Sequence, residues 1–325
     1  MTTMISVGAT EGGEAFVAPT DPMDKIDRDR YGRPMVRNAA NKKEPYTRCT
    51  TFAGVLEDTY NLGRWSNRMV AIGLVDRPDL QLAVAAHRDD KEHLNKICED
   101  AAEAGKAHAA ATIGTALHAL TEQHDRGQLD LNYVPAAYRN DIQAYIDTTA
   151  PLEMVQIETF GVIDELKIAG TWDRIVRVGG RCMIADLKTG SVDYGMGKIA
   201  IQLAIYSRCK RYDIKTGTRH KLPDVDQDHA LVIHLPAGSG TCRLIDVDIA
   251  AGWEAVDLAR QVKAWRARKN LSTEFDPSNL ALVDAIQTAT TVDELERLWE
   301  ANEGAWTETL TLIAKERKHA LQGAA

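Results

Sequence analysis

Three short runs of residues between positions 154 and 188 constrain the fold more than any other part of the sequence. They read MVQIETFGVI, KIAGTWDRIVRV and RCMIADLK, and they are rich in β-branched side chains. Asp164-Glu165 separates the first two runs, and Gly179-Gly180 separates the last two. This arrangement predicts three consecutive strands, the last two joined as a hairpin. The chain therefore contains a β-sheet.

In the sequence, helical patterns come both before and after these predicted strands. Phe52, Val55, Leu56 and Tyr60 recur at helical spacing after a possible N-cap at Thr50 or Thr51. Further helices are expected over residues 80–87, one or two over the Ala-rich stretch 91–123, and others over 136–148, 197–211 and 253–269. HALVIHLP and TCRLIDVDI predict two more strands. The expected fold class is α/β, with a mixed central sheet flanked by helices.

The sequence also suggests how the chain is divided. Residues 1–45 are polar and are expected to be largely irregular, and residues 46–270 are expected to form one domain. The helical part of that domain covers 46–150, and its sheet and associated helices cover 151–270. Residues 276–325 predict a helical extension of two amphipathic helices.

Composition limits the environment and the partners. The five cysteines are scattered and form no C-x-x-C pair, as expected for reduced thiols in a cytoplasm. The sequence has neither a signal-like N-terminus nor an apolar run that could span a membrane, so we expect no membrane association. A net charge of −8 disfavours a protein that simply coats nucleic acid, but it is compatible with local basic strips around catalytic carboxylates.

Asp186 and Lys188 are the first residues that suggest chemistry. They lie two apart in a predicted strand, so their side chains share a face, about 7 Å apart along the strand. A plain ion pair explains most such pairs. Asp173, in the strand before, can lie beside Asp186 across the hairpin, and two adjacent carboxylates repel unless a cation lies between them. Oxygen ligands of this kind suit Mg²⁺ or Mn²⁺, although Asp173 could instead be a turn residue that pairs with Arg174 or Arg177.

Two helices carry weaker signals. Gly114, His118 and Glu122 are each four residues apart and share one helical face, where Gly114 permits close approach and His118 offers an imidazole to a metal. A histidine in an Ala-rich helix can equally be a core residue. Gln202 and Tyr206 also share a helical face and can hydrogen-bond a phosphate or a base edge, although this spacing is common in ordinary helices.

Taken in chain order, these pieces resemble the PD-(D/E)XK nuclease superfamily, in its RecB-like branch, which includes phage-encoded and CRISPR-associated exonucleases. The matching parts cover about residues 46–250. They are the Gly114/His118/Glu122 helix, the Gly170-Thr171-Trp172-Asp173 strand, Asp186-Leu187-Lys188-Thr189-Gly190 and the Gln202/Tyr206 pair. Glu158 falls where members of this group often carry an acidic residue.

The resemblance implies a restriction-endonuclease-like sheet and a metal-dependent deoxyribonuclease, most simply an exonuclease of phage or bacterial DNA recombination, replication or repair. His118, Asp173 and Asp186 would bind Mg²⁺ or Mn²⁺, with help from the Leu187 backbone carbonyl. Lys188 would orient the attacking water and stabilise charge on the phosphorane. Gln202 and Tyr206 would position the substrate, and Glu122 and Glu158 would support the site.

An iron–sulfur cluster, which several relatives hold, is not expected here. Cys49 could stand for the early cysteine ligand of such relatives, but the C-terminal cysteine cluster is missing from the sequence. The expected cofactor is therefore a metal ion alone. In a phage-encoded protein, the compartment would be the cytoplasm of the bacterial host.

Two basic strips are candidates for contact with DNA, although such runs are often only solvated faces. The first comprises Arg208, Lys210, Arg211, Lys215, Arg219 and Lys221, and the second comprises Arg260, Lys263, Arg266, Arg268 and Lys269. Tyr46, Arg48 and Thr50 could form a wall of the DNA channel, or Thr50 could only cap a helix.

Two alternatives to a nuclease remain open from the sequence. One is a catalytically silent protein that binds DNA ends or assists recombination on the same fold. The other is a metal hydrolase that acts on a small substrate. In each case the helical extension could dock on the core or on a partner such as a strand-annealing protein.

Overall fold

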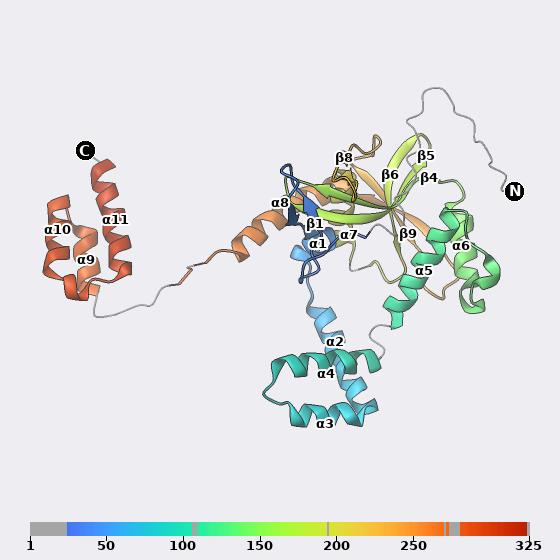
Figure 1. The fold of residues 1–325 in the computed structure, drawn as a ribbon, viewed down its shortest axis with the longest axis horizontal. Coiled ribbons are helices and arrows are strands. Elements are labelled where there is room, and N and C mark those ends of the chain that lie inside the picture. Colours follow the sequence, from blue (N-terminus) through green and yellow to red (C-terminus); the bar gives the residue numbers. More distant parts are fainter. Residues whose placement is uncertain (1–24, 106–108, 194, 270, 273–279, 324–325) are drawn as a thin grey trace. The chain divides into compact units, whose positions relative to one another are not determined.

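The structure is a computed structural model that describes residues 25–105, 109–193, 195–269, 271–272 and 280–323. The irregular lead-in expected over residues 1–24 lies outside the described residues. The chain divides into two compact units, Met1–Lys263 and Ala264–Ala325. The first unit is mixed α/β, with a central mixed sheet flanked by helices (Figure 1), as the sequence predicts.

The central sheet contains the three strands expected between residues 154 and 188. Its strand order is β10-β9-β6-β5-β4-β7-β8, with the short β3 alongside β5. The β6–β9 and β3–β5 pairs are parallel and the others are antiparallel. The bounds are β3 Thr47–Arg48, β4 Glu153–Ile163, β5 Ile168–Val178, β6 Arg181–Lys188, β7 Lys210–Tyr212, β8 Arg219–His220, β9 His229–His234 and β10 Arg243–Asp248. Gly179 and Gly180 have φ of +56° and +82°, so the hairpin turn requires glycine-like backbones.

Most helices of the first unit lie where the sequence predicts them. They are α1 Cys49–Ala53, α2 Tyr60–Asp76, α3 Pro78–Ala86, α4 Lys91–Ala104, α5 Ala109–Asp125, α6 Arg139–Thr149, α7 Met196–Ser207 and α8 Ile249–Arg266. Helix α2 was not predicted, although Leu62, Trp65, Met69 and Ile72 recur in it at helical spacing. The helix predicted over residues 197–211 ends at Ser207, and β7 follows it. The N-cap of α1 is Arg48 and makes no side-chain cap hydrogen bond, so the expected cap at Thr50 or Thr51 is wrong.

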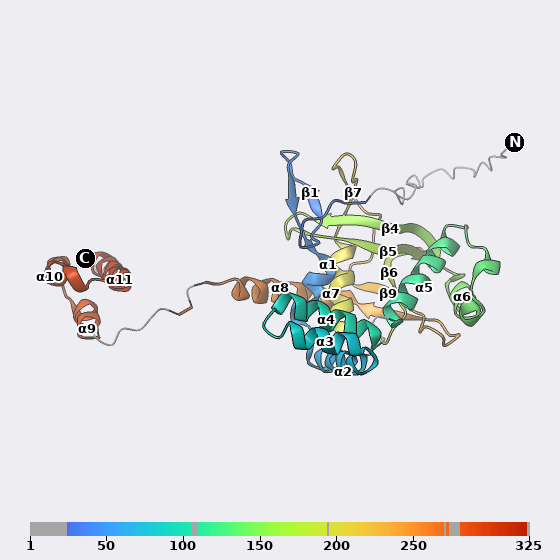
Figure 2. The same cartoon turned by 60° about the horizontal axis from the view of Figure 1, so that its bottom comes forward.

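Both faces of the sheet are covered. On the face where Figure 2 shows α1 and α7, Trp172 and Ile184 belong to one apolar cluster with Phe52 of α1, Leu203 of α7 and Val256 of α8. Helix α7 is buried along most of its length. Helix α8 can approach it closely because a Cβ at Gly252 would lie only 2.4 Å from the Ala200 carbonyl oxygen. On the other face, Tyr145 of α6 packs with a second apolar cluster, and Leu117 of α5 packs against α6.

Helices α2, α3 and α4 form a small helical group with its own core. Leu80, Ile97 and Ala101 are its buried residues. Two glycines allow α2 and α4 to touch backbone to backbone. A Cβ at Gly73 would lie 1.7 Å from the Ala101 carbonyl oxygen, and one at Gly105 would lie 2.2 Å from the Met69 carbonyl oxygen. The packing of this group therefore combines a small apolar core with close backbone approach of α2 and α4.

Residues 25–45, expected to be irregular, instead contain paired strands. The strands β1, Met35–Arg37, and β2, Lys43–Pro45, are antiparallel. Val36 is fully buried in a cluster with Phe160 and Tyr212 on the outer part of the main sheet. This contact comes from distant parts of the chain, which explains why local composition did not indicate it.

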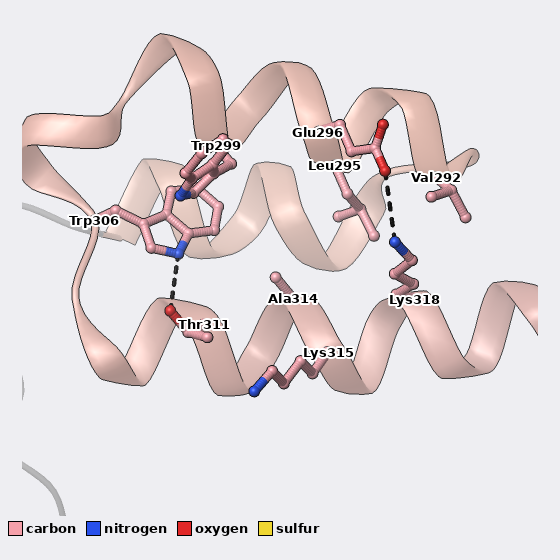
Figure 3. A pocket seen from close by; sticks show the side chains of 9 residues that line it. All are labelled: Val292, Leu295, Glu296, Trp299, Trp306, Thr311, Ala314, Lys315 and Lys318. Atoms are coloured by element: carbon pink, nitrogen blue, oxygen red, sulfur yellow. Dashed lines mark hydrogen bonds and ion pairs between the residues drawn. The ribbon is translucent and has the colours of Figure 1, made fainter.

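The second unit contains three described helices, α9 Leu280–Thr288, α10 Val292–Ala301 and α11 Glu308–Gly323, rather than the two expected. Ile286, Leu295 and Leu310 form its core. Beside that core, Trp299 and Trp306 line a cavity of about 230 Å³ (Figure 3). The Trp306 indole donates to Thr311 Oγ1 at 3.1 Å across this region. Among the helices described, none is both long and apolar enough to cross a bilayer.

Candidate metal centre

The candidate site lies where β5 and β6 separate. Their ladder ends at the Arg174–Ala185 pair, and continuing the same register would set Asp173 opposite Asp186. Beyond that pair, the Leu187 N–H donates to Asp173 Oδ2 at 2.8 Å instead of to a β5 carbonyl. The Asp173 side chain therefore closes a fork between two strands, with β6 continuing along β9.

Two further metal-binding groups meet Asp173 at this fork. His118 Nδ1 of α5 lies 3.6 Å from Asp173 Oδ2. Glu158 of β4 lies opposite Asp173, because its neighbours Ile157 and Thr159 pair with the two residues that flank Asp173. Ligand atoms of His118, Glu158 and Asp173 all lie within 4.8 Å of one another, and all three residues are half-buried. Two carboxylates and an imidazole thus converge from three elements.

Glu158 is held in an unfavourable state by its surroundings. Its φ of +45° is in the left-handed region, which a residue with a Cβ seldom adopts and which costs on the order of 1 kcal/mol or more. Burial, together with the negative charges of Asp173 and Glu122, raises the pKa of its carboxyl to about 8. The pKa shift indicates a carboxylate whose ionised form is disfavoured by burial and by nearby negative charge.

Asp186 and Lys188 form the adjacent part of the site. Lys188 Nζ makes an ion pair with Asp186 Oδ2, and Gln202 Nε2 donates to Asp186 Oδ1 at 3.2 Å. Asp186 is buried, and burial together with the charge of Asp173 raises its pKa to about 7. Burial works against the Lys188 charge, but attraction to Asp186 outweighs it and raises the pKa of Lys188, which stays cationic.

The structure thus brings the residues predicted from sequence into two neighbouring groups. His118, Asp173 and Glu158 make one, and Asp186, Lys188 and Gln202 make the other. Asp186 does not belong to the described group whose ligand atoms lie within 4.8 Å, although its pKa shift shows that it senses Asp173. Asp173 is the residue that connects the two groups.

His118 is in the form that a metal needs. Burial lowers the pKa of its imidazole, and the charges of Arg174 and Lys188 act in the same direction. Asp173 and a hydrogen bond with the Leu187 backbone oppose this shift without reversing it. The imidazole is therefore neutral near pH 7, with a lone pair available for coordination.

A buried ion pair, not predicted from the sequence, joins α5 to the sheet beside this site. Arg174 Nε lies 2.5 Å from Asp125 Oδ2, and both side chains are only 1% exposed. Arg174 also donates to Thr121 Oγ1 at 3.0 Å, and that hydroxyl donates to the His118 carbonyl at 2.9 Å. The signal was present, because Arg174 interrupts an otherwise apolar strand face, but its partner lies 49 residues away.

The other residues of the α5 face contribute to position and charge. A Cβ at Gly114 would lie 2.7 Å from Thr189 Oγ1, so the expected close approach at Gly114 brings α5 against the end of β6. Glu122 pairs with Arg126 at 2.8 Å. Its charge raises the pKa of Glu158, which makes Glu122 a neighbour of the site and not one of the converging ligands.

Gln202 and Tyr206 are buried, and their described contacts are with protein groups. Gln202 is 8% exposed and binds Asp186, whereas Tyr206 is 3% exposed. The Tyr206 ring meets Trp172 edge-on, and Gly170 leaves the room for its hydroxyl. Tyr206 therefore has no surface for the direct substrate contact expected from sequence, and Gln202 orients a site carboxylate.

The basic strips are only partly available to a ligand. Arg208 donates to the carbonyls of Ala204 and Gln227 and lies over the Trp253 ring, and Arg219 binds Asp164. Lys210 is exposed, 3.9 Å from Glu165, and Arg211 is half-buried in β7. In the second strip, Arg260 pairs with Asp257, and Lys263 donates to Thr47 Oγ1. Its last three residues, Arg266, Arg268 and Lys269, belong to the second unit.

The expected channel-wall segment has mixed exposure. Tyr46 is 2% exposed and donates to Asp164 Oδ1 at 2.8 Å, so its hydroxyl serves the fold. Arg48 and Thr50 are exposed. Cys49 is buried beneath α7, where its thiol donates to the Gln202 carbonyl at 3.7 Å.

No protein-family model matches the chain, and a search of curated proteins finds no match. The fold and the site therefore define the chain by themselves, as a mixed α/β protein with a cluster of ionisable residues where two central strands diverge.

Proposed function

We propose that this chain is a metal-dependent deoxyribonuclease with a restriction-endonuclease-like sheet of the PD-(D/E)XK type. The observation that carries the proposal is the convergence of His118, Glu158 and Asp173 at a strand fork, beside the Asp186–Lys188 pair. The ordered sequence pattern that resembles RecB-like nucleases supports it, because that pattern contains the same residues.

The residues at the fork fit a hard divalent cation. Carboxylate oxygens with one imidazole are ligands suited to Mg²⁺ or Mn²⁺. Burial, together with the negative charge of Asp173, raises the pKa values of Glu158 and Asp186, so a cation at the fork would favour their ionised forms. His118, Asp173 and Glu158 would hold the ion, with Asp186 and the Leu187 carbonyl completing its surroundings.

A divalent ion at this position would lower the pKa of a bound water and neutralise negative charge that develops on the scissile phosphate. The protein's own groups supply the remaining requirements. Lys188 is 30% exposed, so its ammonium reaches the solvent side of the fork while Asp186 anchors it. It places a fixed positive charge where a phosphate anion would gain charge. Gln202 holds Asp186 in the orientation that keeps Lys188 there.

DNA is the proposed substrate, and exonucleolytic digestion in phage or bacterial recombination, replication or repair is the proposed role. Exposed basic residues such as Lys210 and Lys221 offer phosphate contacts outside the fork. The unit Ala264–Ala325 is the proposed docking element for a recombination partner such as a strand-annealing protein.

The experiment that tests the proposal is digestion of end-labelled linear, nicked and circular DNA in Mg²⁺ or Mn²⁺. We expect wild-type chain to degrade linear DNA and to spare circles, and Asp186→Asn to be inactive with an unchanged circular-dichroism spectrum. Asp246→Asn removes an exposed carboxylate of β10 and should retain full activity. A wild-type chain that binds DNA ends without cleaving them would replace the nuclease with an end-binding protein, and metal-dependent activity that excess DNA does not inhibit would indicate a small substrate.

A further inference from the structure

A second group of metal-binding side chains lies at the turn between α3 and α4. Ligand atoms of His87, Asp90 and His93 all lie within 4.8 Å of one another. None of these residues belongs to the fork between β5 and β6. We propose that this turn, the α3–α4 turn, binds a Zn²⁺ ion through the two imidazoles and the Asp90 carboxylate.

Local backbone contacts hold the three side chains in place. The Asp90 N–H donates to the His87 carbonyl at 3.0 Å and closes the turn. Asp90 is also the N-cap of α4, where its Oδ1 accepts from the Glu92 and His93 N–H groups at 3.0 and 3.1 Å. One carboxylate oxygen is thus committed to the helix end, which leaves Oδ2 directed at the imidazoles.

Oδ2 of Asp90 contacts His93 Nδ1 at 2.7 Å. A carboxylate oxygen and an imidazole nitrogen are both zinc ligands, so an ion that takes the place of the proton between these two atoms would be bound by both of them. The rings of His87 and His93 are parallel, with centroids 4.4 Å apart and planes 7° from parallel. Because the His93 side chain is 60% exposed, its ring has room to rotate so that both imidazoles face one ion.

The donor set selects a different ion from the one proposed for the fork. Two imidazoles favour Zn²⁺ and similar transition metals, whereas a carboxylate-rich site favours Mg²⁺ or Mn²⁺. The ligands come from the residue after α3 and from the first turn of α4. Since few buried apolar residues hold these helices together, a bound ion would stabilise the small helical group by joining the two helix ends.

The test is calorimetric titration of Zn²⁺ into the full chain in excess Mg²⁺. We expect one zinc equivalent that His87→Gln and His93→Gln each weaken at least about tenfold. Asp90→Asn should also weaken it while keeping α4 intact, because Asn is an equally good N-cap. His229→Gln is the matched control, since His229 contacts Asp246 at 2.9 Å on the surface but belongs to no described group of three ligands.

Two results separate this site from the proposed nuclease centre. Asp173→Asn should retain the zinc equivalent, and His87→Gln should digest DNA in Mg²⁺ at the wild-type rate. The proposal is overturned if the wild-type chain binds no zinc equivalent in excess Mg²⁺, or if both histidine variants bind zinc as the wild type does. Neither result would bear on cleavage at the fork.

Discussion

Asp173 Oδ2 accepts the Leu187 N–H at 2.8 Å, and the same oxygen lies 3.6 Å from His118 Nδ1. One carboxylate therefore satisfies the backbone where β5 and β6 part and also belongs to the proposed metal ligands. Removing the Asp173 side chain would therefore affect both the backbone hydrogen bond and the proposed metal ligand. Two different substitutions of Asp173 can distinguish the two roles.

Replacing Asp173 with asparagine or alanine should separate the two roles. Asparagine keeps an acceptor for the Leu187 N–H, whereas alanine leaves that donor unpaired and should lower the free energy of unfolding by roughly 1–3 kcal/mol. Both should reduce metal-dependent cleavage by about 100-fold or more, because each removes a charged ligand. Chemical denaturation and DNA digestion measure the two effects. Cleavage by Asp173→Asn at the wild-type rate would contradict the assigned ligand.

Glu158→Gln should make the metal-free protein more stable at alkaline pH. The folded-state pKa of Glu158, about 8, lies above the ordinary value of 4.5, so the folded state holds this proton more tightly than the unfolded state. This tighter proton binding stabilises the folded state fully below pH 4.5, and the stabilisation is lost as the pH rises toward 8. The advantage of Glu158→Gln should therefore grow by up to about 1.4 kcal/mol per pH unit across this window.

Denaturant titrations in EDTA at several pH values measure this difference. Adding Mg²⁺ or Mn²⁺ should restore the wild type at pH 8 and leave Glu158→Gln almost unchanged, since the variant lacks the charge that the ion compensates. Parallel pH profiles for the two proteins without metal would show that Glu158 does not titrate in this range.

Lys188→Ala should slow cleavage and shift its pH dependence. Loss of the ammonium removes a positive charge from the reaction site, which we expect to lower the rate about 10²- to 10³-fold. Lys188 lowers the pKa of Asp186, whereas burial and the charge of Asp173 raise it. Without Lys188 the pKa of Asp186 should therefore rise above about 7. The variant should then reach its full Mn²⁺ affinity only at a higher pH than the wild type does. An unchanged pH profile would mean that Lys188 does not control Asp186.

The sequence was most informative where site residues are close along the chain. Asp173 and Asp186 are joined by one hairpin, so strand alternation and a glycine turn were enough to predict that they are neighbours. The roles of Glu158 and Arg174 were harder to predict. Glu158 reaches the fork through a positive φ and a register shift between Met154 and Gln156, and neither is visible in composition. The burial of Arg174 is explained by its ion pair with Asp125, which lies on α5, far from Arg174 in the sequence.

The Arg174–Asp125 pair should be a positioning element for His118. Asp125→Ala leaves the buried guanidinium without its carboxylate and should lower the free energy of unfolding by about 3–5 kcal/mol. The double variant Arg174→Met/Asp125→Leu removes both charges and should recover much of that loss. Mn²⁺ affinity should still be reduced in the double variant, because Thr121 and the His118 backbone lose their tie to β5. Wild-type Mn²⁺ affinity in a stable double variant would show that α5 is held by apolar packing alone.

Gly114 should be required because of Thr189. In a helix, alanine is ordinarily favoured over glycine by about 1 kcal/mol. Here the added Cβ would lie 2.7 Å from Thr189 Oγ1, too close unless the Thr189 side chain, α5 or the end of β6 moves. Gly114→Ala should therefore be destabilising by roughly 1–3 kcal/mol. It should also weaken Mn²⁺ binding, since His118 lies one helical turn further along α5.

A double-mutant cycle tests whether the contact with Thr189 causes the loss of stability and of Mn²⁺ affinity in Gly114→Ala. Thr189→Ala removes the hydroxyl that the new Cβ would meet, so adding it to Gly114→Ala should restore both stability and Mn²⁺ affinity. We expect an interaction energy of about 1 kcal/mol or more between the two positions. Thr189→Ser keeps the hydroxyl and should not rescue. If the two substitutions are additive, α5 is not positioned by this contact, and the approach of His118 to Asp173 must depend on the Arg174–Asp125 pair instead.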